Sequence, residues 1–403
     1  MNISTAAIES LNWLDDKQQP MLDLIVELCD VNSGTFNLAG LEKVRRRLVE
    51  EFSTLAGEIN VIDSEPWQTV DDKGVAEAGK SGPILHIKKW PEATTTIMLC
   101  IHMDTVYGPE HPFQKCVTKD DGCVNGPGVI DAKGGIVVML NALRALEASP
   151  LAGKIGWEVI LNSDEEIGSR GSDQFIRSRA PHCTAGLLFE PSLPDGTLVS
   201  WRKGSGNFAF VVRGRSAHTG RDFEKGRNAL AALSRLCIEI DELNTSPEIT
   251  YNVGRINGGG ALNAVPDLAV GRVNVRVVDT DQQQQVERKF KELVEKYNQL
   301  DGISVEMQGV FSSPPKPLDD GVRAMQHRIE SCGEALGIKI QWRGTGGASD
   351  GNRFAAAGLP NIDTLGPCGD HIHSDEEFLI PESLVPRAKL AALVLMSFLE
   401  SSG

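Results

Sequence analysis

The first half of the chain alternates between amphipathic stretches and short apolar runs. Apolar side chains recur at the spacing of one helix face in residues 19–30, 41–52 and 134–147. Short apolar runs of the length of buried strands lie at 84–87, 97–101, 157–161 and 187–189. Strands interleaved with helices are typical of an α/β sheet, so we expect this part of the chain to form an α/β core.

The pattern changes near residue 204, where strands and helices follow a different order. The elements that we expect are a strand at 208–212, a helix at 228–243, strands at 250–256 and 270–277, a helix around 286–297 and a strand at 304–310. This order indicates a small α+β sandwich of ferredoxin-like type. We therefore predict an inserted domain at residues 204–312, flanked by the two parts of a larger domain at residues 1–203 and 313–403.

Beyond the insert, the pattern returns to that of the first half. Prolines within residues 312–318 stiffen the chain and indicate a linker. A helix at 322–336, a glycine-rich loop at 344–351 and a final helix at 381–400 then complete the predicted α/β domain. No internal repeat is found.

Composition narrows the class of protein. A length of 403 residues and a hydrophobic content of 41% allow two domains with cores of their own. The net charge of -15 argues against a nucleic-acid binder, whose affinity rests on Lys and Arg. The start of the chain lacks a basic segment followed by an apolar one, and no segment approaches the roughly 18 unbroken apolar residues of a membrane helix. We expect a cytoplasmic protein without a nucleic-acid or membrane partner.

The cysteines exclude one kind of metal site. Eight of them are scattered along the chain, and no two form a C-x-x-C pair. In a chain of this size such a distribution favours free thiols over a disulfide framework. A zinc site built on sulfur ligands is therefore not expected.

Polar side chains follow three of the predicted strands at the point where each apolar run stops. His102 comes directly after one strand, Glu165 and Glu166 follow the next, and Glu190 follows a third. A single histidine beyond a strand is usually an ordinary rim residue. However, sites in open α/β sheets are built at the carboxyl ends of the strands, and three such ends carry histidine or carboxylate here.

Simpler interpretations also stay open for His102 and for two aspartates, Asp104 and Asp131. His102 and Asp104 point to the same side of an extended chain, so the carboxylate can hold the imidazole ready for a metal, or merely cap the strand end. Asp131 stands just before the helix at 134–147, where its simplest role is that of a capping carboxylate. Taken alone, Asp131 would be assigned to capping.

The adjacent Glu165 and Glu166 are either a solvated acidic patch or parts of a metal site. The apolar strand before them and the glycines after them favour the site, where one carboxylate binds a metal and its neighbour takes a proton from water. A ligand set of nitrogen and oxygen suits zinc, with cobalt or manganese as substitutes. Near the C-terminus, His371 or His373 offers a further ligand, and spacing does not choose between them. His218 lies in the predicted insert and is interpreted as a turn residue.

Seven short motifs occur in a consistent order over nearly the whole chain. They are His102-Met-Asp-Thr105, Gly126-Pro-Gly-Val-Ile-Asp-Ala-Lys-Gly-Gly135, Asp164-Glu-Glu-Ile-Gly168, Phe189-Glu-Pro191, Ser216-Ala-His-Thr-Gly220, Gly347-Ala-Ser-Asp350 and His373-Ser-Asp-Glu-Glu377. With these motifs the chain resembles the zinc metallopeptidase family of glutamate carboxypeptidase, acetylornithine deacetylase, succinyl-diaminopimelate desuccinylase and aminoacylase. Each motif is weakly specific, but seven in register make a chance match very improbable.

The resemblance implies a site with two zinc ions and five ligands. Asp131 is expected to bridge the ions, His102 and Glu190 to complete one site, and Glu166 and His373 to complete the other. His373 is preferred over His371 because the rest of the family motif, Ser374-Asp-Glu-Glu377, follows it directly.

The resemblance also implies the reaction and the roles of two further carboxylates. Glu165 matches the general base, and Asp104 matches the carboxylate behind the first histidine. The implied reaction is hydrolysis of an amide by a metal-activated water, with Glu165 carrying the proton to the leaving nitrogen.

The implied fold is a mixed-sheet catalytic domain of the zinc-exopeptidase type with an inserted lid and dimerisation domain. His218 is then expected to reach the active site of the partner subunit in a homodimer and to stabilise the oxyanion. Asn263 and Arg276 match lid positions that bind a substrate carboxylate, for which the paired donors of arginine are suited. Gly347 is a further candidate for substrate binding.

The branch of the family is indicated by three features. Glu190 is the ligand type of carboxypeptidases and deacylases, whereas related aminopeptidases have Asp there. The Gly126-Pro-Gly128 form favours the glutamate carboxypeptidase branch, but Ala132 replaces the second aspartate that this branch commonly has after the bridging one. The peptide at that point is cis in solved relatives.

We therefore predict a di-zinc carboxypeptidase or amidohydrolase that acts on a small N-acylated amino acid or peptide with a free carboxylate. The first alternative is an N-deacylase of the acetylornithine deacetylase or desuccinylase type. A non-catalytic binding paralogue is disfavoured because all six ligand and base positions are filled. A two-metal phosphoesterase is disfavoured because the lid motifs fit a carboxylate better than a phosphate.

Overall fold

The larger domain is built on a six-stranded mixed sheet, which the computed structural model describes together with the rest of residues 5–399. The strand order is β1 (Glu58–Ile62), β4 (Ile84–Lys89), β8 (Gly156–Asn162), β5 (Thr96–His102), β9 (Ala185–Leu188) and β16 (Asn361–Ile362). Strands β8, β5, β9 and β16 run parallel, and β4 runs against both of its neighbours. The expected mixed α/β fold is confirmed.

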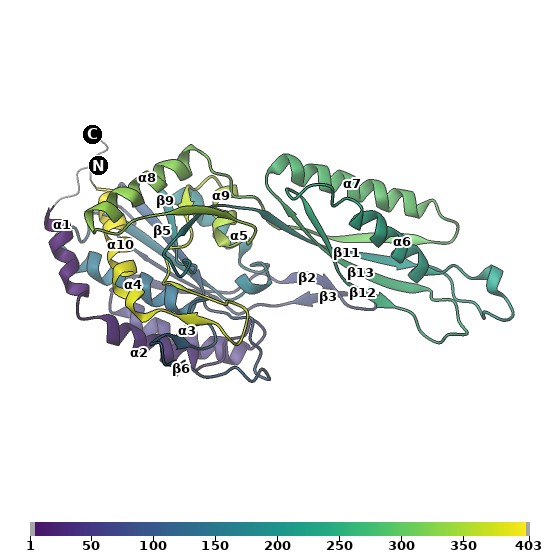
Figure 1. Cartoon of the computed structure of the whole chain (residues 1–403), viewed down its shortest axis with the longest axis horizontal. Helices are drawn as coiled ribbons and strands as arrows, with labels where there is room; N and C mark the ends of the chain where they lie inside the picture. The colour runs from purple at the N-terminus through teal and green to yellow at the C-terminus, as the bar shows by residue number, and fades with distance from the viewer. Residues whose placement is uncertain (1–4, 400–403) are drawn as a thin grey trace.

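Helices cover both faces of this sheet, because its central strands are apolar on both sides (Figure 1). In β5, Leu99 and Ile101 belong to the main core, whereas Met98 and Cys100 belong to a smaller core on the other face. The helices of the main core are α2 (Gln18–Cys29), α3 (Leu38–Ser53), α4 (Lys133–Glu147), α8 (Asp320–Ala335) and α10 (Leu384–Ser397), and those of the smaller core are α5 (Asp173–Arg179) and α9 (Asp350–Ala356). Helix α4 is buried on almost every side, which fixes the segment that precedes it.

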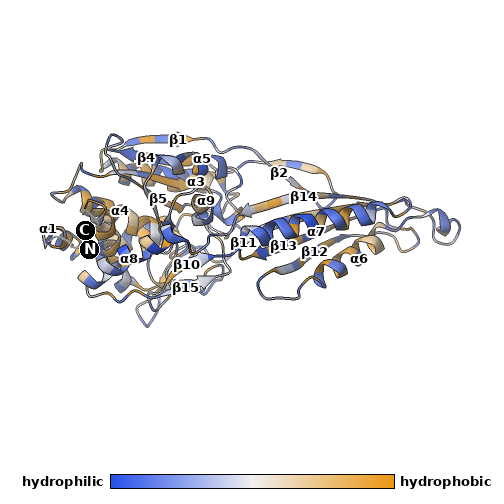
Figure 2. Ribbon diagram, turned by 90° about the horizontal axis from the view of Figure 1, so that it is seen from above, coloured by the Kyte–Doolittle hydropathy of each residue, from blue (hydrophilic) through white to orange (hydrophobic). Residues whose placement is uncertain are grey.

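The second unit is a four-stranded antiparallel sheet with two helices on one face (Figures 1 and 2). Its elements are β11 (Gly204–Arg213), α6 (Ala229–Asp241), β12 (Thr250–Gly258), β13 (Leu268–Val277), α7 (Thr280–Asn298) and β14 (Ser304–Ser313), and its strand order is β12-β13-β11-β14. Phe208 and Phe210 of β11 pack edge-on against Phe290 of α7. The apolar face of α7 thus covers the sheet, while its hydrophilic face is turned outward (Figure 2).

A hairpin that the sequence pattern did not predict connects the two units. Strands β2 (Trp67–Val70) and β3 (Ala76–Gly79) extend from the larger domain toward the inserted sheet (Figure 1). Val70 packs with Val211 and Val270 on the sheet face opposite the helices. The guanidinium of Arg272 donates to the Val70 carbonyl oxygen at 2.7 Å and to Asp72 at 3.0 Å. The insert is therefore held by this hairpin as well as by its two chain connections.

The two chain connections meet at one buried aspartate. Arg202 on the outward connection and Lys316 on the return pair through their backbones. Both side chains reach Oδ2 of Asp363, at 2.7 and 3.0 Å, and all three residues are buried. Burial alone would raise the pKa of Asp363, but the two cations outweigh it and hold the pKa at about 2.

The remaining strands form two small sheets beside the main one. They are β10 (Leu198–Arg202) with β15 (Trp342–Thr345), and β17 (Gly369–Asp370), β18 (Phe378–Leu379), β7 (Val124–Asn125) and β6 (Val117–Thr118). The predicted loop at 344–351 is wrong at both ends, because Gly344 and Thr345 extend β15 and Asp350 begins α9 under a capping box of Ser349 and Asn352. The last helix, predicted at 381–400, is shorter, since α10 begins at Leu384 after a short 3-10 turn and ends at Ser397, while residue 400 lies outside the described residues.

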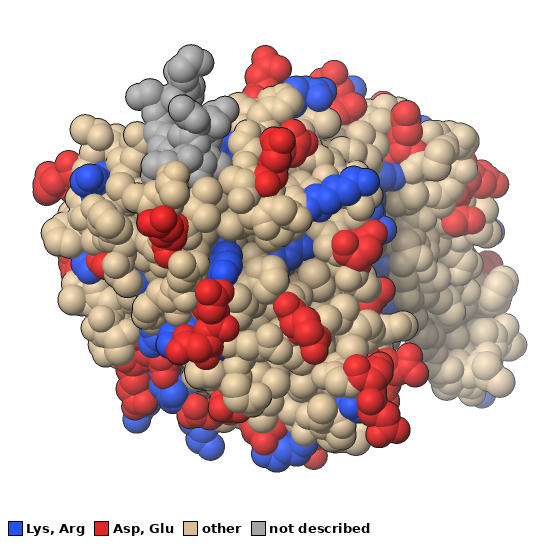
Figure 3. Space-filling model, turned by 60° about the vertical axis from the view of Figure 1, so that its left-hand side comes forward, with Lys and Arg blue, Asp and Glu red and all other residues tan. Residues whose placement is uncertain are grey.

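Three further features are the state of the cysteines, the length of the apolar helices and the distribution of charge on the surface. All eight cysteines lie within the described part of the chain, and none of them forms a disulfide there. Between residues 5 and 399, no helix combines the length and apolar character needed to cross a membrane. On the face drawn in Figure 3, basic and acidic side chains are interspersed, without the continuous basic stripe of a nucleic-acid-binding surface.

Asp363→Asn should destabilise the larger domain, because Arg202 and Lys316 would stay buried without their anion. Breaking such a buried pair costs about 3–5 kcal/mol. A carboxylate with a lowered pKa contributes stability above its unfolded pKa of about 3.9 and loses it as the pH falls toward the folded value. Denaturant unfolding should show a constant difference from the parent between pH 7 and about 4, and a shrinking one below. The exposed Asp120→Asn is the control, and equal stability of both variants at pH 7 would refute the role of Asp363.

Candidate metal centre

Parallel strands bring three ligand-bearing segments to one edge of the main sheet. His102 is the last residue of β5 and is paired in register with Asn162, the last residue of β8. Cys100 is paired with Leu188 at the end of β9, which places Glu190 level with His102. Side chains that are far apart in the sequence therefore meet at the carboxyl ends of these strands.

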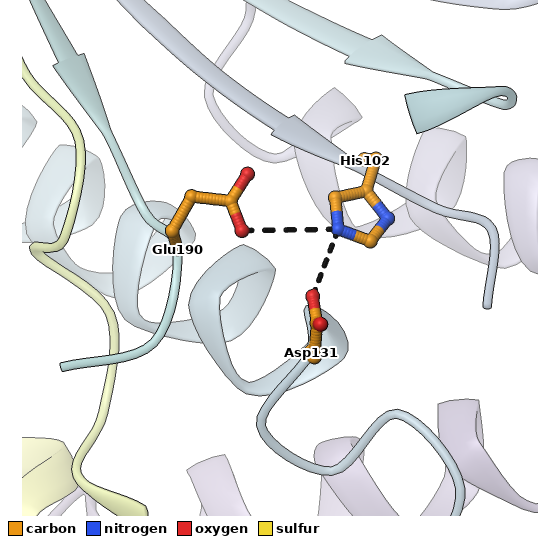
Figure 4. A group of neighbouring side chains, drawn as sticks. All are labelled: His102, Asp131 and Glu190. Carbon is orange, nitrogen blue, oxygen red and sulfur yellow. Dashed lines mark hydrogen bonds and ion pairs between the residues drawn. The ribbon is translucent and has the colours of Figure 1, made fainter. Parts of the chain in front are cut away.

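The first group of candidate ligands is formed by His102, Asp131 and Glu190 (Figure 4). Nε2 of His102 lies 3.0 Å from Oδ1 of Asp131 and 3.9 Å from Oε2 of Glu190. Asp131 comes from the loop before α4, and the Asp131–Ala132 peptide is cis. All three residues are buried. Their ligand atoms lie within 4.8 Å of one another, as in a set that holds one ion.

The second group shares Asp131 with the first. Nε2 of His373 lies 3.3 Å from Oδ2 of Asp131 and 3.1 Å from Oε2 of Glu166. The two oxygens of Asp131 thus face different groups, each of which adds one histidine and one glutamate. His371 instead lies 3.8 Å from Glu376, away from both groups. This arrangement matches two ions joined by one bridging carboxylate.

The electrostatics of the site fit divalent cations. Burial raises the pKa of Glu190 to about 8 and that of Glu166 to about 7, and the Asp131 carboxylate adds to both rises. Burial, followed by the charge of Glu190, also raises the pKa of Glu165 well above its usual value. Oε1 of Glu166 is buried and has no hydrogen-bond partner among residues 5–399. A pair of divalent cations would offset the desolvation and mutual repulsion of these buried carboxylates. The nitrogen and oxygen donors suit zinc.

Asp104 lies behind this site and organises it. Its carboxylate is fully buried, and its Oδ1 lies 3.3 Å from Nδ1 of His102. The same carboxylate accepts the backbone N–H groups of Glu165, at 3.2 Å, and Glu166, at 3.3 Å. The hydroxyl of Thr35 donates to it at 2.7 Å. The residue Glu165 is partly exposed as a whole, and Asp104 holds its backbone beside the candidate ligands.

The residues expected to bind substrate do not all reach this centre. The guanidinium of Arg276 donates to the Gly346 carbonyl oxygen at 3.3 Å, and the Gly347 carbonyl oxygen accepts from Arg202 at 3.2 Å. Arg276 and the loop of Gly347 therefore lie together where the insert meets the larger domain.

His218 and Asn263 lie together elsewhere in the insert. Both are exposed, and the N–H of Thr219, next to His218, donates to the Asn263 carbonyl oxygen. They follow the end of β11 that is remote from the chain connections. Ten residues of strand at about 3.3 Å each place that end about 30 Å from the connections. This separation argues against a direct contact of either residue with the candidate metal centre of its own chain.

The sequence pattern gave no role to three residues that support the centre. Thr35 contacts Asp104 across 69 positions of the chain, and Tyr107 contacts Glu377 across 270. Glu377 is the last residue of the motif that begins at His373, but its spacing from His373 does not reveal that it reaches the Asp131 loop. No local pattern carries such a signal.

Known proteins match the chain over most of its length. The family model "Peptidase family M20/M25/M40" matches residues 98–397. Carboxypeptidase G2 of Pseudomonas sp. (strain RS-16) is 25% identical over 94% of this chain and 90% of its own length. Succinyl-diaminopimelate desuccinylase of Verminephrobacter eiseniae is 27% identical over 72% of this chain and 75% of its own.

A solved structure shows the same fold. The M20 family metallo-carboxypeptidase Sso-CP2 from Sulfolobus solfataricus superimposes with a TM-score of 0.70 at 17% identity, covering 93% of this chain and 98% of that one. The family match accounts for about three quarters of the sequence and includes all five candidate ligands. The chain therefore belongs to the M20/M25/M40 family of metallopeptidases and is a hydrolase.

Proposed function

We propose that this protein is a di-zinc amidohydrolase of the carboxypeptidase type. Its substrate would be a small N-acylated amino acid or peptide with a free carboxylate. The observation that carries the proposal is the sharing of Asp131 between two complete ligand groups beside the partly exposed Glu165. The similarity to carboxypeptidase G2 over nearly the whole chain supports the carboxypeptidase branch.

In the proposed mechanism, Glu165 moves the proton. A pair of zinc ions would polarise the scissile carbonyl and lower the pKa of an attacking water. Glu165 takes one proton from that water and delivers it to the leaving nitrogen, so that amide and water become carboxylic acid and amine. Asp104 holds the backbone of Glu165 in place through its N–H group and orients the imidazole of His102.

Arg276 is proposed to bind the free carboxylate of the substrate. It lies on β13 opposite Ser205, close to the chain connections, and so faces the larger domain. Its guanidinium donates from Nη1 to the Gly346 carbonyl oxygen across the domain boundary and from Nε to Asn274 within the insert. Its remaining N–H groups are proposed to bind the ligand. Gly347 on the same loop is proposed as a neighbouring substrate contact.

His218 and Asn263 are proposed to act on the metal centre of a partner subunit in a homodimer. The proposal is supported by their exposure and by the distance of about 30 Å along β11 between them and the connections to the larger domain. An imidazole delivered by the partner would stabilise the oxyanion that forms when the carbonyl is attacked.

The substrate class is tested with zinc-loaded and chelated protein on a panel of amides. We expect zinc-dependent hydrolysis of an N-acyl or folyl glutamate, and at least tenfold slower hydrolysis of the matching substrate with an amidated carboxyl group. Arg276→Ala should remove this preference. Turnover of N-acetylornithine or N-succinyl-diaminopimelate alone would assign the chain to the deacylase branch instead, and hydrolysis that survives complete chelation would refute a metal mechanism.

Glu165→Ala should keep both zinc ions and lose activity by about 10²–10⁴-fold, because it removes the group that transfers the proton. Metal content by elemental analysis and kcat on the best substrate provide the two readouts. Glu376→Ala, on an exposed position of the His373 loop, is the control and should keep both. Lost zinc together with residual turnover would assign Glu165 to metal binding.

His218→Ala should lower kcat by about 10²–10³-fold without changing zinc content. Because the proposed contact is between subunits, mixing the His218→Ala and Glu165→Ala proteins under exchange conditions should restore activity. A heterodimer of the two has one site with both groups intact. An absence of restoration after confirmed exchange, or normal kinetics of His218→Ala in a confirmed dimer, would contradict a role across the interface.

A further inference from the structure

The carboxylate of Glu377 is inserted into the loop that carries Asp131. Oε1 accepts the backbone N–H groups of Ile130, at 3.1 Å, and Asp131, at 3.2 Å. Oε2 accepts the N–H of Gly128 at 3.2 Å. Glu377 is 1% exposed, so these three donors have no water to replace it. One side chain therefore determines the path of the backbone that presents Asp131.

The backbone of Glu377 belongs to a different loop, the one that carries His373. The Tyr107 hydroxyl lies 2.7 Å from the Ser374 carbonyl oxygen and 3.0 Å from Oε2 of Glu377. The amide of Asn125 donates to the carbonyl oxygen of Glu377 at 2.7 Å. Glu377 thus ties the His373 loop to the Asp131 loop, and Tyr107 supports this tie.

The five candidate ligands differ in how firmly the fold holds them. His102 and Glu190 stand at the ends of buried strands. The side chain of His373 is 51% exposed, and its loop is closed at the base by the two-residue pairing of β17 and β18. A ligand on a loop is placed less precisely than one on a strand. Among the distances between candidate ligands, the distance between His373 and Asp131 therefore depends most on Glu377.

We propose that Glu377 is a positioning residue that sets the metal affinity of the Asp131–Glu166–His373 group, with Tyr107 as its support. The inference rests on the proposed two-metal function. Removal of the carboxylate would leave three buried N–H groups without an acceptor and let the two loops move apart. The binding of the ion in the Asp131–Glu166–His373 group would then be weaker. The ion of the His102–Asp131–Glu190 group would be affected less, because two of its three ligands are fixed by strands.

Glu377→Gln is the decisive variant, because it keeps the shape of the side chain. Its amide oxygen can still accept from Ile130 and Asp131, but its NH₂ group would face the N–H of Gly128 and the Tyr107 hydroxyl. Tyr107→Phe removes the hydroxyl that contacts Glu377 and Ser374 and keeps the aromatic ring. Asp375→Asn, an exposed position on the same loop, removes an equal charge as the matched control.

Zinc titration of the metal-free proteins by calorimetry tests the proposal without any substrate. The parent and Asp375→Asn should bind two ions. In Glu377→Gln one site should stay within about threefold of the parent, and the other should weaken by about 10–100-fold. His373→Ala identifies the weakened site, because it should remove the same one. Tyr107→Phe should weaken that site to a smaller extent.

Other outcomes separate this inference from the proposed function. If the parent protein does not bind two ions, the two-metal function fails. If the parent binds two and Glu377→Gln keeps both affinities, or loses both equally while its thermal unfolding stays cooperative, only the positioning role of Glu377 is overturned. Should Glu377→Gln fail to fold, a selective loss in Tyr107→Phe supports the proposal and unchanged affinities in it refute it.

Discussion

One buried carboxylate, that of Asp104, determines the geometry on which the rest of the site depends. A charged group without access to water must be satisfied by donors, and the protein supplies them from separate segments of the chain. The backbone of the Glu165 and Glu166 turn, the hydroxyl of Thr35 and the imidazole of His102 all converge on it. Two candidate metal ligands, His102 and Glu166, and the proposed base Glu165 are thereby fixed relative to one another.

The sheet provides the frame for this convergence, and the loops complete it. Parallel strands bring His102, Glu166 and Glu190 to one edge, and the deeply buried helix α4 fixes the segment of Asp131. His373 is different, because it comes from a loop on a small peripheral sheet. The centre therefore combines rigid ligands with one that must be positioned by contacts reaching across the chain.

Sequence reasoning succeeded where a local pattern carries the information. Helices such as α7 and strands such as β5 follow from periodicity, and the polar residues at three strand ends indicated a site. The half-exposed β1 and the hairpin of β2 and β3 were missed because they lack an apolar run, and α5 and α9 because they have only seven residues each. Spacing alone did not separate His371 from His373, since only the fold shows which imidazole faces Asp131.

The hairpin of β2 and β3 connects the insert with the turn that carries the proposed base. At its tip, Asp72 and Val70 contact the inserted sheet. At its base, the hydroxyl of Ser81 donates to Asp164, the residue directly before the proposed base. The inserted sheet is thus linked to the turn of Glu165 by a path of contacts that is separate from the two chain connections at Asp363.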